Sequence, residues 1–214
     1  MKIGEKLLVL MEALDEPTLD DAVETLARRS SDIQSLLGQL LQDFDDINYQ
    51  AAQAARLHET STHFVWQLAG LPDEGVRIAL NEYKSNGSTP VTYAGSLHDH
   101  RYDFASLILS GGYDFENYRV DLDESVVVRE RYHLLEVGSV RCGEVARVPN
   151  ELFHRLVRTL PNTVTLLIKL PPVKPASTSY DLRTGRIQRH VVFGERPRML
   201  QSKLRNLLTG MEER

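Results

Sequence analysis

Three histidines have a spacing that could bring their imidazoles to one metal ion. His98 and His100 are two residues apart, so on an extended strand both side chains point to the same face. His154 follows a turn that Gly143 and Pro149 form, and it would reach the same place from a distant strand. Three neutral imidazole nitrogens suit Fe(II), Zn, Ni, Cu or Mn and leave coordination positions open. A metal centre is therefore the first hypothesis.

No other pattern in the chain offers a catalyst. The sequence has no GxGxxG before a helix, no phosphate loop and no nucleophile motif in a suitable context, so nucleotide-dependent and acyl-transfer chemistry have little support. His63, His133 and His190 lack partners at metal-ligand spacing and are interpreted as ordinary strand histidines.

Polar residues on strand faces are the candidates for substrate binding. In VRIALNEYK, alternation puts Arg77, Asn81 and Tyr83 on one face, where they would line a pocket if that face points inward. Arg129 and Arg131 share one face of the run from Val126 to Leu135. An inward arginine would pair with a substrate carboxylate, whereas an outward one is a solvated surface residue, and the sequence leaves both open.

One tyrosine is a candidate catalytic residue. Tyr113 follows Gly111 and Gly112, and the turn at this glycine pair would place it near the strand that carries His98 and His100. This position makes it a better candidate than the arginines for contact with a substrate.

Composition limits the class of protein. The 214 residues, 42% hydrophobic and 26% charged, are enough for a buried core without disulfides. The formal net charge of −5 is mild and spread along the chain, so no nucleic-acid partner is expected. A single cysteine fits a reducing compartment, and the N-terminus resembles no signal peptide. No apolar run reaches the roughly 20 residues that span a bilayer. A cytoplasmic protein without a membrane partner is the expectation.

The elements that must position these residues change type about a third of the way along the chain. Residues 2–57 carry leucines at helical spacing, with Thr18 as a helix cap before Asp20 and Asp21. From His63 onward, short runs rich in branched and aromatic residues alternate with Gly, Pro and Asn, which indicates a β-sandwich or barrel. We divide the chain into a helical segment (1–60), a β-barrel (61–195) and a C-terminal helix (196–214).

Both histidine motifs resemble those of the cupins. The second cupin motif is Gly, five residues, Pro, any residue, Gly, two residues, His, and Gly143, Pro149 and His154 match it with only the middle glycine replaced, by Glu151. The first motif begins His, any residue, His, which His98 and His100 match, and it ends at a glycine that Gly111 or Gly112 provides. The resemblance covers roughly residues 63–170.

The resemblance departs from the family at one ligand. The cupin glutamate falls at Phe104 or Ala105, and the nearest acid is Asp103, which an odd spacing puts on the opposite strand face unless the strand bulges. We interpret Asp103 as a second candidate catalytic residue, an acceptor that orients a histidine. A three-histidine site is the simpler reading.

The resemblance implies a fold and a function. The fold would be an all-β core, the cupin double-stranded β-helix or jelly-roll barrel, with a helical segment before it and a short helix after it. Cupins with three histidines and no glutamate include the thiol dioxygenases of the cysteine dioxygenase type. The string HDHRYDFASLILSGGY also resembles small uncharacterised bacterial cupins with a His-x-His, Asp-Phe and Gly-Gly-Tyr pattern.

The expected function is therefore that of a non-haem iron dioxygenase. Fe2+, or alternatively Zn2+, Ni2+, Mn2+ or Cu2+, would bind at the histidines, and O2 would react with a small, carboxylate-bearing metabolite. The alternatives are a metal-dependent isomerase or lyase, and a cupin that only binds a small ligand. The helical segment would pack on the barrel or on a second subunit, and a homodimer is expected.

Overall fold

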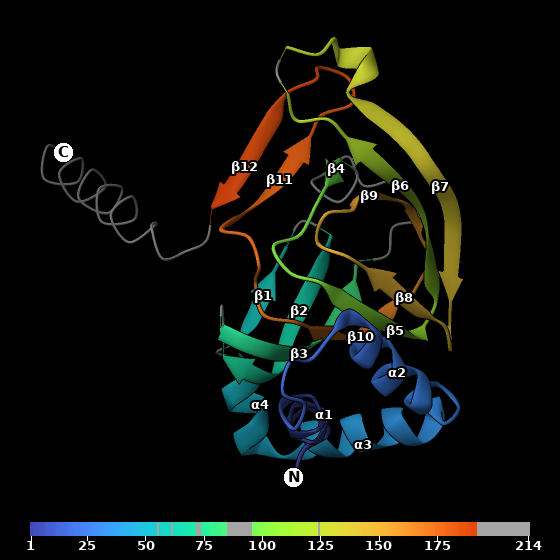
Figure 1. Cartoon of the computed structure of the whole chain (residues 1–214). Helices are drawn as coiled ribbons and strands as arrows, with labels where there is room; N and C mark the ends of the chain where they lie inside the picture. The colour runs from blue at the N-terminus through green and yellow to red at the C-terminus, as the bar shows by residue number, and fades with distance from the viewer. Residues whose placement is uncertain (55, 61, 72–73, 85–95, 124, 192–214) are drawn as a thin grey trace, which may run out of the picture.

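Two antiparallel sheets of six strands form the body of the protein, and helices cover one of them (Figure 1). The computed structural model describes residues 1–54, 56–60, 62–71, 74–84, 96–123 and 125–191. The described helices are α1 (Ile3–Glu12), α2 (Leu19–Ser30), α3 (Ile33–Asp45) and α4 (Ile47–Ala54), with a 3-10 helix, η2, at Val128–Glu130. The described strands are β1 (Leu57–Glu59), β2 (His63–Leu71), β3 (Glu74–Tyr83), β4 (Leu97–His98), β5 (Phe104–Ser110), β6 (Gly112–Val120), β7 (Tyr132–Arg141), β8 (Val145–Val148), β9 (Phe153–Thr159), β10 (Val164–Lys169), β11 (Ala176–Tyr180) and β12 (Ile187–Val191).

The order of the strands defines the fold. Sheet A runs β1-β2-β3-β10-β5-β8 and sheet B runs β12-β11-β4-β9-β6-β7. β3 pairs with β10, β4 with β9, β5 with β8 and β6 with β7, so the pairs are nested around the β6–β7 hairpin and alternate between the sheets. This arrangement is the jelly roll, or double-stranded β-helix. The predicted fold class is confirmed.

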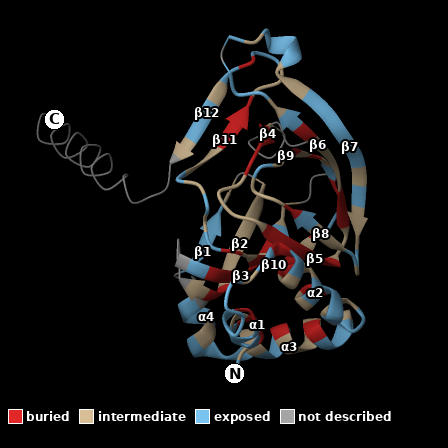
Figure 2. Cartoon of the chain, viewed as in Figure 1, coloured by how far each residue is buried: buried red, intermediate tan, exposed pale blue. Residues whose placement is uncertain are grey.

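The helices pack against the outer face of sheet A. Their buried residues, among them Leu7, Met11 and Leu26, form one apolar cluster with Ile78 and Leu107 of the sheet. In Figure 1 the helices lie beneath β3, β10 and β5, and in Figure 2 red, buried segments mark this contact. The helical segment, expected to pack on the barrel or on a second subunit, packs on the barrel of its own chain. The expected homodimer stays a prediction.

The N-terminal helices follow the local signals of the sequence. Thr18 caps α2 as expected: its side chain accepts from the backbone N–H of Asp21, and the Asp21 carboxylate accepts in return from the Thr18 N–H. The helices end at Ala54, and β1 already lies inside the range assigned to the helical segment. The predicted C-terminal helix lies outside the described residues. None of the described helices is long and apolar enough to cross a membrane.

One predicted strand is partly wrong. Residues 125–131 form no strand: Asp123 accepts from the backbone N–H of Ser125, a turn follows, and η2 precedes β7, which begins only at Tyr132. The carboxylates of this acidic connection bind its own backbone N–H groups, which favours a turn over a strand. β7 is then an edge strand with most residues exposed (Figure 2).

Candidate metal centre

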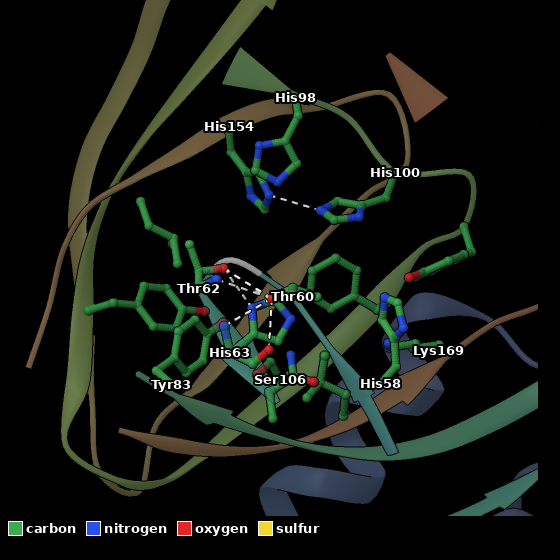
Figure 3. A pocket seen from close by; sticks show the side chains of 16 residues that line it. His58, Thr60, Thr62, His63, Tyr83, His98, His100, Ser106, His154 and Lys169 are labelled. Carbon is green, nitrogen blue, oxygen red and sulfur yellow. Dashed lines mark hydrogen bonds between the residues drawn. The ribbon is translucent and has the colours of Figure 1, made fainter. Parts of the chain in front are cut away.

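The three predicted ligands lie together inside the barrel. One ring nitrogen from each of His98, His100 and His154 lies within 4.8 Å of the others, and the Nε2 atoms of His100 and His154 are 3.0 Å apart. Figure 3 shows the three imidazoles pointing toward one another at one wall of a pocket. The structure therefore brings together the residues that two separated sequence motifs offered.

The backbone that carries the histidines differs from the expected extended strand. β4 ends at His98, which is the register partner of His154 on β9, so these two ligands are cross-strand neighbours. His100 lies beyond the end of β4, in the connection to β5. Its ring still meets those of the other two histidines at the site.

A hydrogen-bond network holds this connection in place. Asp99, between the first two histidines, accepts from the backbone N–H of Thr178 and from the ammonium of Lys174 at 2.6 Å. Lys174 also donates to the backbone carbonyl of Asn150, which lies shortly before β9. Asn150 in turn donates to Asp103 through its backbone N–H at 2.6 Å and its amide at 2.7 Å. The segments before His100 and before His154 are thus tied to each other.

Asp103 therefore has a different role from the one predicted. Its carboxylate accepts from Asn150, so the hydrogen bond expected from a histidine is not the one that it makes. It lies at neither the pocket wall nor the metal cluster. Asp99 and Lys174, which the sequence analysis missed, tie the connection that carries His100 to Thr178 and Asn150.

Burial keeps the cluster neutral. Desolvation lowers the pKa of His98 to about 4, and it lowers the pKa values of His100 and His154 well below the usual value. The Nδ1 of His98 lies 3.0 Å from the carbonyl oxygen of Ser96, which can only accept, so Nδ1 carries the proton and Nε2 is the unprotonated nitrogen. Neutral imidazoles are the form that ligates a metal.

The separation of His100 and His154 fits a shared metal ion. Two nitrogens bound to the same ion at about 2.1 Å lie roughly 3.0–3.4 Å apart, and the His100–His154 separation of 3.0 Å falls at the lower end of that range. No carboxylate joins the three histidines in any metal-ligand cluster of the described residues. His98, His100 and His154 would hold the ion and leave positions that face the pocket.

A cavity of about 320 Å³ adjoins the histidines. Phe104, Leu156 and Leu167 give it apolar walls, and polar groups face the histidines from the opposite side (Figure 3). A volume of this size with a few convergent polar groups is typical of a small-molecule site.

Two of the predicted substrate-binding residues and the predicted catalytic tyrosine line this cavity. Asn81 and Tyr83 come from the inner face of β3, and Tyr113 follows a tight turn in which Gly111 has a φ of +69°. A Cβ on Gly111 would lie 2.5 Å from the hydroxyl of Thr163, so the turn requires glycine there. Burial raises the pKa of Tyr83 to about 12 and raises the pKa of Tyr113 further, so both phenols stay protonated at neutral pH.

The predicted arginines do not line the cavity. Arg77 shares the inner face of β3 as expected, but its guanidinium lies over the ring of Tyr102, 4.6 Å from the centroid. Arg129 is exposed on η2, and Arg131 donates to the backbone carbonyl of Val126 at 2.6 Å. The expectation that Arg129 and Arg131 share one face of a strand is wrong, because β7 begins after them, at Tyr132.

Sequence reasoning missed several residues of the cavity wall, and two of them bear on its chemistry. His63, interpreted as an ordinary strand histidine, pairs in register with Tyr83, and its Nδ1 lies 2.9 Å from the hydroxyl of Thr62. Burial, with a smaller effect of Lys169, lowers the pKa of His63 to about 4. Lys169, at the end of β10, is the second. Alternation from Leu167 could have placed it on the inner face, had that face been known.

The comparisons with known proteins give low similarity. No family model and no curated protein matches the chain. Among solved structures, the chain is similar to KdgF from Halomonas sp. (14% identity, 54% of this chain and 86% of that one, TM-score 0.37). It is also similar to the DMSP lyase DddQ from Ruegeria pomeroyi (13%, 61% and 64%, 0.38) and to the vicilin of hazelnut, Corylus avellana (16%, 58% and 33%, 0.39).

These matches are cupin structures, as the sequence motifs led us to expect. Their TM-scores are too low to carry an argument, so the fold rests on the nested strand pairs and the site on its own geometry. The matched proteins include a lyase and a vicilin, and no activity of theirs is assigned to this chain. What the chain itself presents is a jelly roll with a three-histidine cluster at the wall of an internal cavity.

Proposed function

We propose that this protein is a metal-dependent enzyme in which His98, His100 and His154 hold a divalent ion beside the substrate cavity. The observation that supports it is the convergence of three buried, neutral imidazoles on one wall of a cavity of about 320 Å³. A set of three nitrogen donors leaves half of an octahedral coordination sphere for substrate and a co-substrate.

Our first candidate activity is that of an iron(II) dioxygenase. An Fe(II) ion at this site would supply the redox chemistry that O2 needs in order to react with an organic substrate. The protein's own part is to bind and enclose the substrate: Phe104, Leu156 and Leu167 exclude water from the space next to the ligands. The protonated phenols of Tyr83 and Tyr113 can donate hydrogen bonds to a substrate oxygen there.

A second candidate is a lyase or isomerase with a metal that does not change its oxidation state. The observation that favours it is His63, a neutral imidazole that faces the cluster across the cavity and whose Nδ1 pairs with the hydroxyl of Thr62. A fixed neutral imidazole can take a proton from a substrate carbon or oxygen that the metal has made more acidic.

The metal is tested first. Protein purified without oxygen is analysed for bound metals, and His100→Ala and His154→Ala are compared with His133→Ala, which removes an exposed histidine of β7. We expect about one ion per chain in the wild type and in His133→Ala, and a loss of at least tenfold in the two cluster variants, with unchanged circular dichroism. A wild type without metal, or equal metal in all variants, contradicts the proposal.

The type of reaction is tested next. With a library of small metabolites, a dioxygenase consumes O2 in proportion to product and stops under argon, whereas a lyase or isomerase continues without oxygen and accepts Zn or Mn. His63→Gln separates the two: a proton-transfer role predicts a loss of activity of at least 100-fold. The oxygenase candidate predicts a change smaller than tenfold.

A further inference from the structure

Two positive charges stand side by side on the inner face of sheet A. Arg77 of β3 and Lys169 of β10 are register partners, and both contact Tyr102: the guanidinium carbon is 4.6 Å and the ammonium nitrogen 5.7 Å from the ring centroid. Like charges at directly opposite positions of an antiparallel pair destabilise a sheet. A negative charge nearby would therefore offset the repulsion between the two side chains.

The described part of the protein provides no such charge. Neither side chain forms an ion pair or a hydrogen bond there, and Arg77, only 9% exposed, has its Nε and Nη2 buried without a partner. No aspartate or glutamate is among the residues that line the cavity. Burial of a cation without a counterion is unfavourable, so an anion close to this pair would stabilise it through its charge.

Lys169 is the cation that reaches the cavity. It lines the wall across from the three histidines (Figure 3), whereas Arg77 stacks on the ring of Tyr102 and is not among the lining residues. With a divalent ion at the histidines, the cavity would have positive charges at two places and none of the opposite sign on its described walls. Such a cavity favours an anion over a neutral or cationic molecule.

We propose that the cavity binds a small organic carboxylate, with the carboxylate paired to Lys169 and the apolar part of the molecule between Phe104 and Leu167. In a substrate, a second group would face the metal, and only that part of the inference rests on the proposed function. Arg77 strengthens the site through its charge. A carboxylate fits better than a phosphate because Lys169 is the only lysine or arginine among the described lining residues and no helix N-terminus adjoins them.

Binding of simple probes tests the proposal. Isobutyrate and phenylacetate are compared with isobutyramide and phenylacetamide by calorimetry, on protein as purified and after chelation of the metal. We expect each carboxylate to bind at least tenfold more tightly than its amide in both forms. Equal binding of acid and amide by the wild type overturns the proposal, as does tighter binding of inorganic phosphate than of either carboxylate.

A variant shows whether Lys169 is responsible. Lys169→Met keeps an unbranched chain against Tyr102 without the charge. Lys84→Met is the matched control, because Lys84 is paired with Glu59 and is not among the residues that line the cavity. The preference for carboxylate is expected to fall at least tenfold in Lys169→Met and to persist in Lys84→Met. A preference that survives in Lys169→Met and vanishes on chelation assigns the carboxylate to the metal and overturns the inference.

The outcomes for the two proposals are distinguishable. If the wild type holds no metal but the chelated form still prefers carboxylates through Lys169, the proposed enzyme fails and the anion site stands. Without ligand, Lys169→Met should also raise the unfolding midpoint by up to about 4 °C, because it removes one of two like charges. A fall in the midpoint contradicts an unbalanced charge pair.

Discussion

The two faces of sheet A have opposite characters although they share the same strands. On β3, Ile78 faces the helices and Asn81 faces the cavity; on β10, Ile168 faces the helices and Lys169 the cavity. The outer face is a continuous apolar layer. The inner face carries polar atoms without partners, among them the Asn81 Oδ1.

The two faces divide two tasks: the outer face stabilises the fold, and the inner face supplies the groups of the cavity. Alternation with a period of two lets each strand contribute to both at once, so the two faces can be changed independently. Substitutions on the outer face should lower stability and leave binding per folded molecule unchanged. Substitutions that remove a polar or charged group from the inner face should change binding and can raise stability.

The largest effect is expected on the outer face. Leu107→Ala removes a fully buried side chain between β5 and the helices and should lower the free energy of unfolding by about 2–5 kcal/mol. Urea denaturation measures it, with Leu134→Ala on the exposed face of β7 as the control, expected within about 0.5 kcal/mol of the wild type. If metal content per folded molecule fell as well, the two faces would not be independent.

Acid should lower the stability of the protein through a residue of the inner face. The pKa of His63 is about 4 in the folded protein against 6.5 for the free side chain, so only the unfolded chain binds a proton between these values. Stability is full above pH 6.5 and declines as the pH falls toward 4, by on the order of 3 kcal/mol from this residue. Unfolding of metal-free protein at several pH values should show a shallower decline in His63→Gln. Identical pH profiles would mean that His63 titrates normally.

A substitution on the inner face should stabilise the protein. The hydroxyl of Thr165 is fully buried without a hydrogen-bond partner, so Thr165→Val replaces it with a methyl group of similar size. We expect a gain of about 1 kcal/mol in thermal unfolding. A loss of stability would show that this hydroxyl has a partner, such as a bound water, and would weaken the contrast between the faces.

The smallest effect concerns a contact that belongs to neither face. Arg147 of β8 lies 3.1 Å from Asp20 of α2, and both side chains are more than half exposed. Asp20→Asn should change the free energy of unfolding by less than about 0.5 kcal/mol, because solvent screens exposed ion pairs. A larger change would mean that the helical layer depends on this contact as well as on its apolar cluster.

Local patterns were enough to predict much of this molecule. The cap at Thr18, the β-runs from His63 onward and the alternation on β3 are properties of short stretches of sequence, and each is present. The three histidines could be grouped because two separated motifs matched one known arrangement.

What could not be predicted depends on which strands become neighbours. Nothing near Lys169 indicates that it lies opposite Arg77, and nothing near Asp99 indicates that Lys174 binds it. The face that points inward is decided only when the helices cover the other one. The error at Arg129 was local, since the carboxylates before it favoured a turn where branched residues indicated a strand.

The nested strand pairs also have a consequence for how the chain folds. The β6–β7 hairpin joins near neighbours in sequence, whereas His98 and His154 pair across more than fifty residues, and β3 with β10 across more than eighty. Such a high contact order is typical of slow folding, and the inner pairs can form before the outer ones. The metal ligands therefore meet late. The rate of metal uptake during refolding would therefore measure when the strands that carry the ligands pair.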